Sequence, residues 1–269
     1  LELNYIPVNK KNFTWKINLN LTHYKNKITY LPDEKKTTVM DGHGGYMNGS
    51  RYYGEDLPIN TWYMKRFAGL SEDGLSLWYY TDKETNEEKT TTTYSTGDFY
   101  LCGDPNPDLY GGFGTSITFH GFDLSTQFSY LVGGLTYDYG YAGMMGNPTA
   151  TSVGNRWHKD VLKAWSPENP SSTIPRWHFN DLNTTGSSDR FLIDGSYLNL
   201  QNIQVGYTLP DSWTSHLKIK NLRLYFVCDN VYYWSKRKGL DPRRSISGVG
   251  TSGKIAPFRT YSGGISLQF

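Results

Sequence analysis

The residues of this sequence with the most evident binding chemistry are its aromatic side chains. The 269 residues include 22 Tyr, 12 Phe and 8 Trp, so 16% of the chain is aromatic. Because aromatic faces stack on sugars and other apolar ligand surfaces, rings in long connections between strands are candidate substrate-binding residues. The candidates are Trp157, Trp165, Trp177, Tyr232, Tyr233 and Trp234. For any single one of them the sequence favours the alternative, a place in an interfacial girdle or in loop packing.

Carboxylates offer a second kind of chemistry, but their spacing indicates no particular site. Loop calcium ligands are conceivable among five aspartates: Asp104, Asp108, Asp181, Asp189 and Asp241. Without EF-hand spacing, solvated turn residues are the favoured interpretation, and we predict no metal or cofactor. The sequence has no HExxH or GxSxG motif, and a carboxylate pair for glycoside hydrolysis needs a spatial separation that sequence does not show. We therefore do not predict an enzyme.

The two cysteines, Cys102 and Cys228, have no CxxC or metal-ligand spacing. A disulfide between them is possible in an oxidising compartment. Cys228 falls on the apolar positions of an alternating segment, so a small apolar residue facing lipid is the favoured interpretation there. The formal net charge of +2 indicates no nucleic-acid partner.

The overall composition excludes transmembrane helices but leaves another way to cross a membrane. Hydrophobic residues make up 37% of the chain and the mean hydropathy is −0.58. No run of about 18 apolar residues occurs, as a transmembrane helix would need. Strands of a membrane barrel alternate apolar with polar residues, and they average to a hydrophilic value.

Alternation with a period of two is the main structural signal. Apolar residues occupy the odd positions from Phe13 to Leu21 and the even positions from Phe122 to Val132. His120 and Gly121 are typical of a two-residue hairpin turn, which places Phe119 and Phe122 on one face. The parity changes again between Leu200 and Ile203, which predicts a β-bulge. About nine strands are predicted, starting near Leu1, Phe13, Ile59, Leu75, Leu109, Phe122, Tyr197, Leu217 and Phe258.

The connections between these strands alternate in length. Residues 9–12, 120–121 and 210–215 are short connections, whereas residues 26–60, 139–189 and 236–257 are long ones. Short turns on one side and long loops on the other are typical of outer-membrane β-barrels. We then expect one face to contact lipid (Phe13, Trp15, Ile17, Leu19, Leu21, Phe122, Leu124 and Phe128) and the other to face the lumen (Lys16, Asn18, Asp123 and Gln127). A secreted β-sandwich acting as a carbohydrate-binding module is the alternative.

Several longer segments carry recognisable motifs in a fixed order. They are GEDLPINTWYMKRFAGL (residues 54–70), GDPNPDLYGGF (103–113), FHGFDLSTQFSYLVGG (119–134), WSPENP (165–170), SDRFLIDGSYLNLQNIQVGYTLP (188–210), GLDPR (239–243) and RTYSGGISLQF (259–269). Together they resemble the C-terminal region of the SusC/RagA family of TonB-dependent outer-membrane transporters, and the resemblance spans nearly the whole chain.

The resemblance implies an all-β fold, an antiparallel transmembrane barrel of roughly 22 strands with a plugged lumen. Residues 1–269 would be its C-terminal portion, with about nine strands; the plug domain and the N-terminal strands have no counterpart here. An open sheet would expose unpaired backbone groups in lipid, so we expect the remaining strands to come from elsewhere in the protein. The implied function is uptake of a bulky nutrient, glycan or peptide, across the outer membrane. The implied partners are a SusD-like surface lipoprotein and TonB, which acts through the plug.

The last eight residues resemble the C-terminal signal for outer-membrane barrel assembly. A polar residue, a glycine two positions later and two apolar residues at alternating positions match this signal in order: Ser262, Gly264, Leu267 and Phe269. An ordinary final strand is the alternative. We expect this strand to pair with the one that follows Leu217 and, on its other edge, with the first strand of the barrel.

Overall fold

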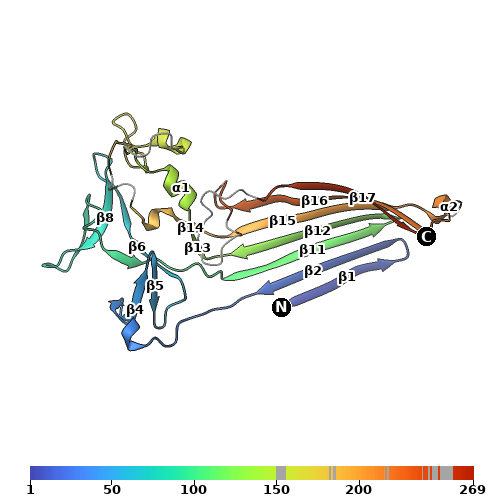
Figure 1. Cartoon of the computed structure of the whole chain (residues 1–269), viewed down its shortest axis with the longest axis horizontal. Helices are drawn as coiled ribbons and strands as arrows, with labels where there is room; N and C mark the ends of the chain where they lie inside the picture. Colours follow the sequence, from blue (N-terminus) through green and yellow to red (C-terminus); the bar gives the residue numbers. More distant parts are fainter. Residues whose placement is uncertain are drawn as a thin grey trace.

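The structure, a computed structural model, describes residues 1–149, 156–181, 183, 186–214, 216, 218–237, 239–241, 243, 248 and 257–269. Their regular secondary structure is mostly antiparallel β-strand, which confirms the predicted all-β class. A long sheet makes up one part of the molecule, and shorter strands and helices gather at one end of it (Figure 1). No helix in the described segments is long and apolar enough to cross a membrane.

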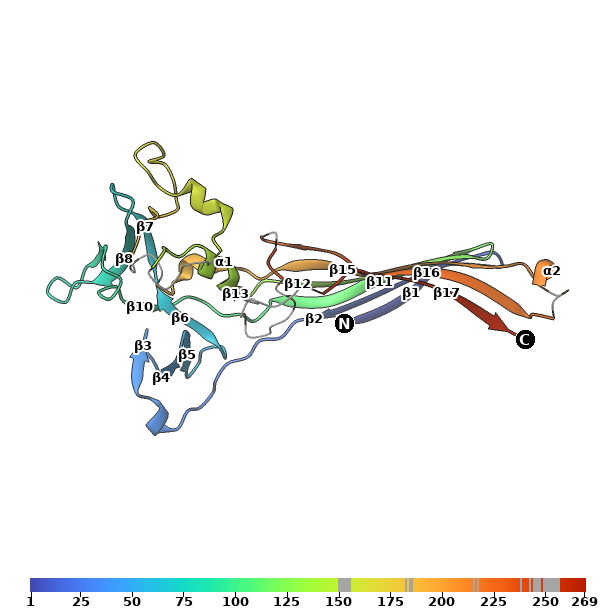
Figure 2. The same ribbon diagram turned by 45° about the horizontal axis from the view of Figure 1, so that its top comes forward.

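Seven strands form the long sheet, and each neighbouring pair runs antiparallel. In spatial order they are β1 (Glu2–Lys10), β2 (Phe13–Thr22), β11 (Leu109–Phe119), β12 (Phe122–Val132), β15 (Tyr197–Thr208), β16 (Asn221–Ser235) and β17 (Thr260–Gln268). They contain 9 to 15 residues, and a tilted strand needs about 9–11 residues to cross a bilayer. Figure 2, turned by 45° from Figure 1, shows the sheet as a thin layer. No second sheet of the described residues packs on either of its faces. The β-sandwich alternative is therefore wrong for these residues.

The pairing register gathers the apolar positions on one face of the long sheet. Phe119 pairs with Phe13 on one side and with Phe122 on the other, while Phe113 lies between Leu19 of β2 and a phenylalanine of β12. Because side chains on paired residues share a face, the apolar positions continue from strand to strand. Polar positions occupy the opposite face, including Lys16, Asn18, Asp123 and Gln127. The predicted division into two faces is confirmed.

Two local irregularities predicted from the sequence are present. His120 and Gly121 both have positive φ, 46° and 87°, as a tight two-residue hairpin requires. The register shifts between Leu200 and Asn202, where β15 pairs with β16. Asn230 on the facing strand has a φ of 51°, a left-handed conformation that asparagine tolerates at a bulge.

The connections at the two ends of the long sheet differ as predicted. Residues 11–12, 120–121 and 209–220 connect strands at the end where the C-terminus and α2 (Asp211–Thr214) lie (Figure 1). Residues 23–108, 133–196 and 236–259 connect strands at the other end. Leu217, the expected start of one strand, lies outside the described residues, and that strand begins at Asn221.

The described residues of the three long connections fold together, and we call this part of the molecule the cap. It contains a five-stranded sheet, β10 (Phe99–Leu101), β6 (Thr61–Lys65), β5 (Arg51–Gly54), β4 (His43–Asn48) and β3 (Thr38–Met40). A three-stranded sheet, β7 (Phe67–Leu70), β8 (Ser76–Thr81) and β9 (Glu88–Thr91), and a pair, β13 (Leu135–Tyr137) and β14 (Leu192–Asp194), accompany it. Its helical segments are η1 (Asp33–Lys35), α1 (Tyr139–Met144), η2 (Lys159–Lys163) and η4 (Asp189–Phe191).

Two of the nine predicted strands belong to the cap and not to the long sheet. The strands expected from Ile59 and Leu75 are β6 and β8, which contain only 5 and 6 residues. All five residues of β6 are buried, whereas a strand that faces lipid on one side and water on the other alternates. The described chain therefore contributes seven strands, not nine, to the long sheet.

The best-packed apolar core lies in the cap. Trp62, Met64, Tyr137, Met145 and Phe191 form one buried cluster drawn from the first two long connections. Backbone hydrogen bonds tie the connections further, since Leu135 N donates to Asp104 O at 2.9 Å and Tyr137 N to Gly248 O at 2.8 Å. The cap is thus one folded body standing on the strand ends of the sheet.

Candidate functional site

The polar face of the long sheet carries rows of amide and hydroxyl groups just below the cap. One row crosses five strands, because consecutive members are paired in register: Asn20, Gly112, Ser129, Asn199 and Tyr233. The next row toward the short-loop end is Asn18, Gly114, Gln127, Asn202 and Asp229. Apart from the carboxylate of Asp229, the polar side chains of these rows donate and accept hydrogen bonds without a net charge.

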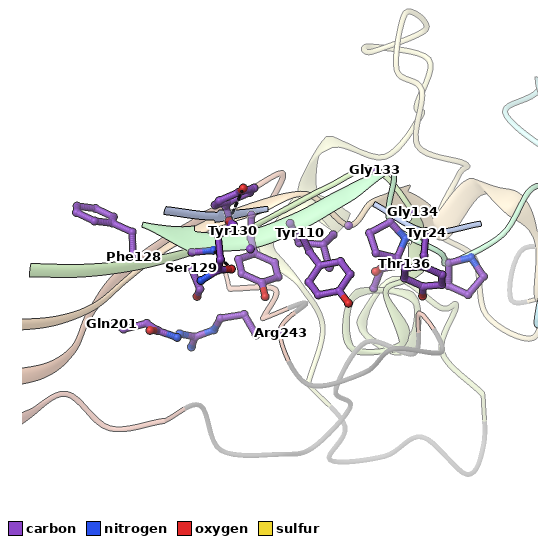
Figure 3. A pocket seen from close by; sticks show the side chains of 18 of the residues that line it. Tyr24, Tyr110, Phe128, Ser129, Tyr130, Gly133, Gly134, Thr136, Gln201 and Arg243 are labelled. Carbon is purple, nitrogen blue, oxygen red and sulfur yellow. Dashed lines mark hydrogen bonds between the residues drawn. The ribbon is translucent and has the colours of Figure 1, made fainter. Parts of the chain in front are cut away.

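A pocket of about 660 Å³ lies where this face meets the cap. The pocket is lined on the cap side by residues at the sheet-proximal ends of the three long connections, and on the sheet side by residues of the strands. Its polar lining residues include Asn20, Tyr24, Tyr110, Gln127, Ser129, Tyr197, Gln201 and Arg243. Figure 3 shows Tyr24, Tyr110, Gln201 and Arg243 arranged along one side of the strands. We call this hollow the wall pocket.

Gly112 keeps part of the floor of the wall pocket open. A Cβ at Gly112 would lie 2.8 Å from Phe128 O, so a side chain is excluded at this position. Asn20 Oδ1 accepts a hydrogen bond from Gly112 N at 2.9 Å, which orients its amide group beside the floor.

Tyrosines stand at the cap side of the pocket. Tyr24 follows β2 and Tyr110 lies near the start of β11, and their rings meet edge to face with centroids 6.0 Å apart. Tyr110 has 39% of its surface exposed, as does Tyr24. Two ring surfaces are thus available to a ligand in the pocket.

Arg243 is held in the pocket by a fixed set of partners. Its Nε and Nη2 donate to the two carboxylate oxygens of Asp241, each at 2.8 Å, and its Nη1 donates to Asn199 Oδ1 at 2.6 Å. The guanidinium also lies 4.6 Å from the ring centroid of Tyr233. The hydrogen bond to Asp241 raises the pKa of Arg243, so the pair stays ionised and its two charges cancel locally.

A second ion pair ties the last long connection to the second one. Arg237 Nε donates to Asp138 Oδ2 at 2.6 Å, and the guanidinium lies 4.3 Å from the ring centroid of Tyr141. Asp138 also accepts from Tyr141 N at 3.0 Å and caps α1. Burial lowers the pKa of Arg237. This pair anchors Arg237 to the second connection.

The tryptophans proposed from the sequence lie in the cap, away from the residues that line the wall pocket. Trp157 and Trp177 contact each other, with ring centroids 5.6 Å apart at 85°. Trp165 packs over Gly74, where a Cβ would lie 2.3 Å from the indole. Trp177 is 43% exposed. Their role in substrate binding stays a prediction.

The three neighbouring aromatic residues of β16 do not act together. They lie within a strand, where the sequence analysis placed a connection. Tyr232 pairs with Leu200 and Trp234 with Leu198, on the apolar face, whereas Tyr233 pairs with Asn199 on the polar face. Tyr233 alone of the three contacts the arginine of the wall pocket. The three residues thus lie on two different faces of the sheet, and their role in substrate binding stays a prediction.

Two of the five aspartates, Asp104 and Asp189, accept hydrogen bonds from backbone N–H groups. Asp189 accepts from Phe67 N at 2.8 Å, and burial raises its pKa. Asp104 accepts from Asn106 N at 2.9 Å in a turn. Over the part of the chain that the structure describes, no group of three or more His, Cys, Asp or Glu residues could hold a metal ion. The expectation that no cofactor is needed stays a prediction.

Both cysteines are free. Cys228 lies on the apolar face between Ile203 and Tyr261, as expected for that position. Cys102 lies in the cap with its Sγ 3.4 Å from Tyr100 O, and burial raises the pKa of its thiol to about 11. The possible disulfide between them is not present.

An aromatic ring of β16 covers one glycine of the final strand. On the polar face a Cβ at Gly264 would lie 2.4 Å from the ring of Tyr225. Ser262 shares this face, while Leu267 pairs with Leu222 on the apolar face. β17 pairs with β16 as predicted. Phe269 follows the strand and is 73% exposed. The function of these residues in assembly stays a prediction.

Most residues of the wall pocket were not identified from the sequence. The alternation assigned Gln127 to the polar face, but adjacency across strands depends on register. In the sequence, Arg243 was noted only as the last residue of the GLDPR segment. Tyr24, Tyr110 and Tyr197 gave no signal that separated them from the other tyrosines.

No family model matches the chain. Over 297 residues it is 28% identical to TonB-dependent receptor P3 of Formosa agariphila, a match that covers 99% of this chain and 28% of that protein. It is 26% identical over 278 residues to TonB-dependent receptor SusC of Bacteroides thetaiotaomicron, covering 99% of this chain and 26% of SusC. The chain thus spans just over a quarter of the length of these curated relatives.

Solved structures show the same fold. The RagAB peptide transporter matches with a TM-score of 0.80 and 23% identity, over 100% of this chain and 28% of that one. The "open-open" state of the RagAB peptide importer matches with a TM-score of 0.78 at 23% identity. The chain is therefore similar to the C-terminal part of a SusC/RagA-like TonB-dependent barrel, in sequence and in fold.

Proposed function

We propose that this SusC/RagA-like chain forms the last part of the barrel wall, and the external cap, of a TonB-dependent importer of bulky nutrients in the outer membrane. The observation that carries the proposal is the long sheet itself. Apolar residues predominate on one face across its seven strands, polar residues predominate on the other, and its long connections fold at one end. Lipid outside and a polar lumen inside are the surroundings that such a sheet needs.

The edges of the sheet support a larger barrel. β1 and β17 are the edge strands, and each pairs with one neighbour within the described chain. Unpaired backbone groups in a membrane cost several kcal/mol each. We infer that further strands of the intact protein pair with both edges and close the wall. The same longer protein would supply the plug through which TonB acts.

The cap offers a surface for a lipoprotein partner. Large apolar side chains are exposed in the connection between β12 and β15, including Leu162 (90%), Phe179 (55%) and Trp177 (43%). Apolar groups of this size on a folded surface are typical of interaction sites. We infer that a SusD-like lipoprotein rests here and covers the external mouth.

Membrane localisation and transport are the direct test of the proposed function. The intact protein should fractionate with outer membranes, need detergent for extraction, and support uptake that is lost when tonB is deleted. Recovery of the intact protein as a soluble secreted species would refute the proposal.

The partner is tested separately by co-purification in mild detergent without crosslinking. A lipidated protein should accompany the intact transporter, and Leu162→Glu should reduce its recovery. Lys159→Glu places the same residue in the same exposed turn and should leave recovery unchanged. Repeated isolation of the transporter alone would reject the lipoprotein partner but not the barrel.

A further inference from the structure

We propose that the apolar face at the cap end of β16 and β17 binds the phosphate group of a lipid in the outer leaflet of the membrane. This inference rests on the proposed function, because it takes the apolar face as lipid-facing and the cap as external. The residues that carry it are Arg259, Tyr261, Tyr232 and Trp234, together with the charge of the last long connection. None of these four residues lines the wall pocket, which lies on the polar face.

The last long connection is strongly basic. Residues 236–259 contain seven Lys or Arg residues and a single acidic residue, Asp241, so their net charge is +6. The whole chain carries only +2, and the rest of it is therefore net acidic. Arg237 and Arg243 already pair with Asp138 and Asp241, but these pairs account for only two of the seven cations. A basic segment beside a membrane surface is attracted to anionic headgroups.

Arg259 lies on the apolar face at the cap end of β17. It precedes this strand by one residue, so alternation places it on the same face as Tyr261, which pairs with Cys228. Its Nη1 donates to Tyr261 Oη at 3.5 Å. Asn230 Nδ2 donates to Phe258 O at 3.1 Å, which ties the neighbouring backbone to β16. The Arg259 side chain is exposed and forms no ion pair with any carboxylate among the described residues.

Aromatic rings accompany this arginine on the same face. Tyr232 and Trp234 are each 48% exposed, and their ring centroids lie 4.8 Å apart. Tyr261 stacks on Phe226 with centroids 6.1 Å apart. Arg259, Tyr232 and Trp234 line a hollow of about 500 Å³ beyond the end of β17, and its described lining includes no carboxylate. Exposed Trp and Tyr rings on a membrane protein lie at the level of the headgroups, so Arg259 is placed where lipid phosphates are.

A phosphate group fits this arrangement better than the other groups that a membrane surface presents. The planar guanidinium offers paired N–H donors that bind two phosphate oxygens at once. A zwitterionic headgroup adds an ammonium, which the surplus positive charge of the last connection would repel. An acidic protein surface is disfavoured as the partner, because Tyr232, Trp234 and Tyr261 lie on the face that contacts lipid.

Lipid binding by the intact transporter, purified in detergent, tests the headgroup chemistry. The probes are lipid A with its phosphate and the same lipid after enzymatic removal of the phosphate, each titrated by microscale thermophoresis. The phosphorylated lipid should bind at least about fivefold more tightly, and added salt should reduce this advantage. Equal affinity for the two lipids would overturn the proposal, and so would displacement of the lipid by millimolar inorganic phosphate alone, which would point to a site for a free anion.

Variants test whether the lipid binds at this end of β16 and β17. Arg259→Gln should weaken binding of the phosphorylated lipid about fivefold and leave the dephosphorylated lipid unaffected. Trp234→Ala should weaken binding of both lipids, because the ring contacts the part that they share. Lys11→Gln removes a positive charge from the exposed turn between β1 and β2, at the other end of the sheet, and should bind as the unmodified protein does. Equal losses for Arg259→Gln and Lys11→Gln, or no loss for Arg259→Gln, would show that this site does not hold the phosphate.

Failure of this inference is distinguishable from failure of the proposed function. Fractionation with outer membranes and TonB-dependent uptake test the proposed function, and neither measurement depends on the lipid phosphate. A transporter that passes both tests but binds the two lipids equally would reject this inference alone. Recovery of the intact protein as a soluble species would refute both.

Discussion

The orientation of the long sheet in the membrane is tested most sharply by placing arginine on either face of one strand. Leu19 and Asn18 are neighbours in β2. Leu19 pairs with Leu3 and Phe113 on the apolar face, whereas Asn18 pairs with Asn4 and Gly114 on the polar face. Leu19→Arg should destabilise the intact barrel strongly, and Asn18→Arg should not.

The expected cost follows from the position of Leu19 along the strand. β2 contains 10 residues, and Leu19 lies about 1.5 residues from its middle. With a rise of about 3.4 Å per residue and a tilt of about 45°, that is about 3–4 Å from the bilayer midplane. Arginine on a lipid-facing site costs about 2–4 kcal/mol at the midplane and about 0–1 near the interfaces. We therefore expect about 2–3 kcal/mol for Leu19→Arg, an equilibrium shift of about 30- to 150-fold.

The control variant, Asn18→Arg, should cost little stability for a physical reason. Asn18 is exposed on the polar face, so an arginine at this position has room and remains hydrated. Its cost should stay within about 0.5 kcal/mol, as is usual for exposed substitutions. The matched pair differs by one position in the chain, so sequence context cannot explain a difference.

Both variants are compared by denaturant titration of the intact protein in lipid vesicles, followed by tryptophan fluorescence. The amount of heat-modifiable, folded barrel in isolated outer membranes gives a second readout that does not need reversible refolding. Equal losses for the two variants, or a greater loss for Asn18→Arg, would refute the assignment of the faces.

Three further predictions concern the end of the chain and the cap. Gly264→Ala should reduce the yield of folded barrel, because its Cβ would collide with the ring that covers this glycine. Gly263→Ala, whose Cβ would meet only a backbone oxygen at 3.9 Å, should insert normally. Equal yields of the two variants would reject the steric argument. Deletion of Phe269 should lower the amount of folded barrel in the outer membrane more than Gln268→Ala does, and normal insertion without Phe269 would reject the assembly-signal interpretation. Cys102 should resist a water-soluble maleimide at pH 8 in the folded protein and react after unfolding, because its pKa is raised to about 11 and the reactive thiolate is scarce; rapid labelling of the native thiol would contradict this.

Features that depend on neighbouring residues could be predicted from the amino-acid sequence. A period of two decides which side chains share a face, whatever strand lies alongside, so the apolar and polar faces were predicted. His120 and Gly121 specify a tight turn, and the change of parity after Leu200 specifies a bulge, for reasons of backbone geometry alone. Lengths of connections are also read directly from the chain.

Local patterns could not separate the long sheet from the cap. The strand at Thr61–Lys65 has strand-like residues, but it is short and buried on both faces because other cap segments pack around it. Tyr232 and Trp234 were expected in a connection because the length of β16 depends on its pairing with β15 and β17.

Which polar groups form a site depends on how distant segments fold together. The wall pocket joins Tyr24, Tyr110 and Arg243, which are far apart in the sequence and meet because three connections fold back onto one end of the sheet. Whether Arg243 adds a positive charge to that site or is neutralised depends on Asp241 lying against it. Sequence specifies the strands and their faces through short-range geometry, whereas pairing register and the fold of the cap bring distant residues together.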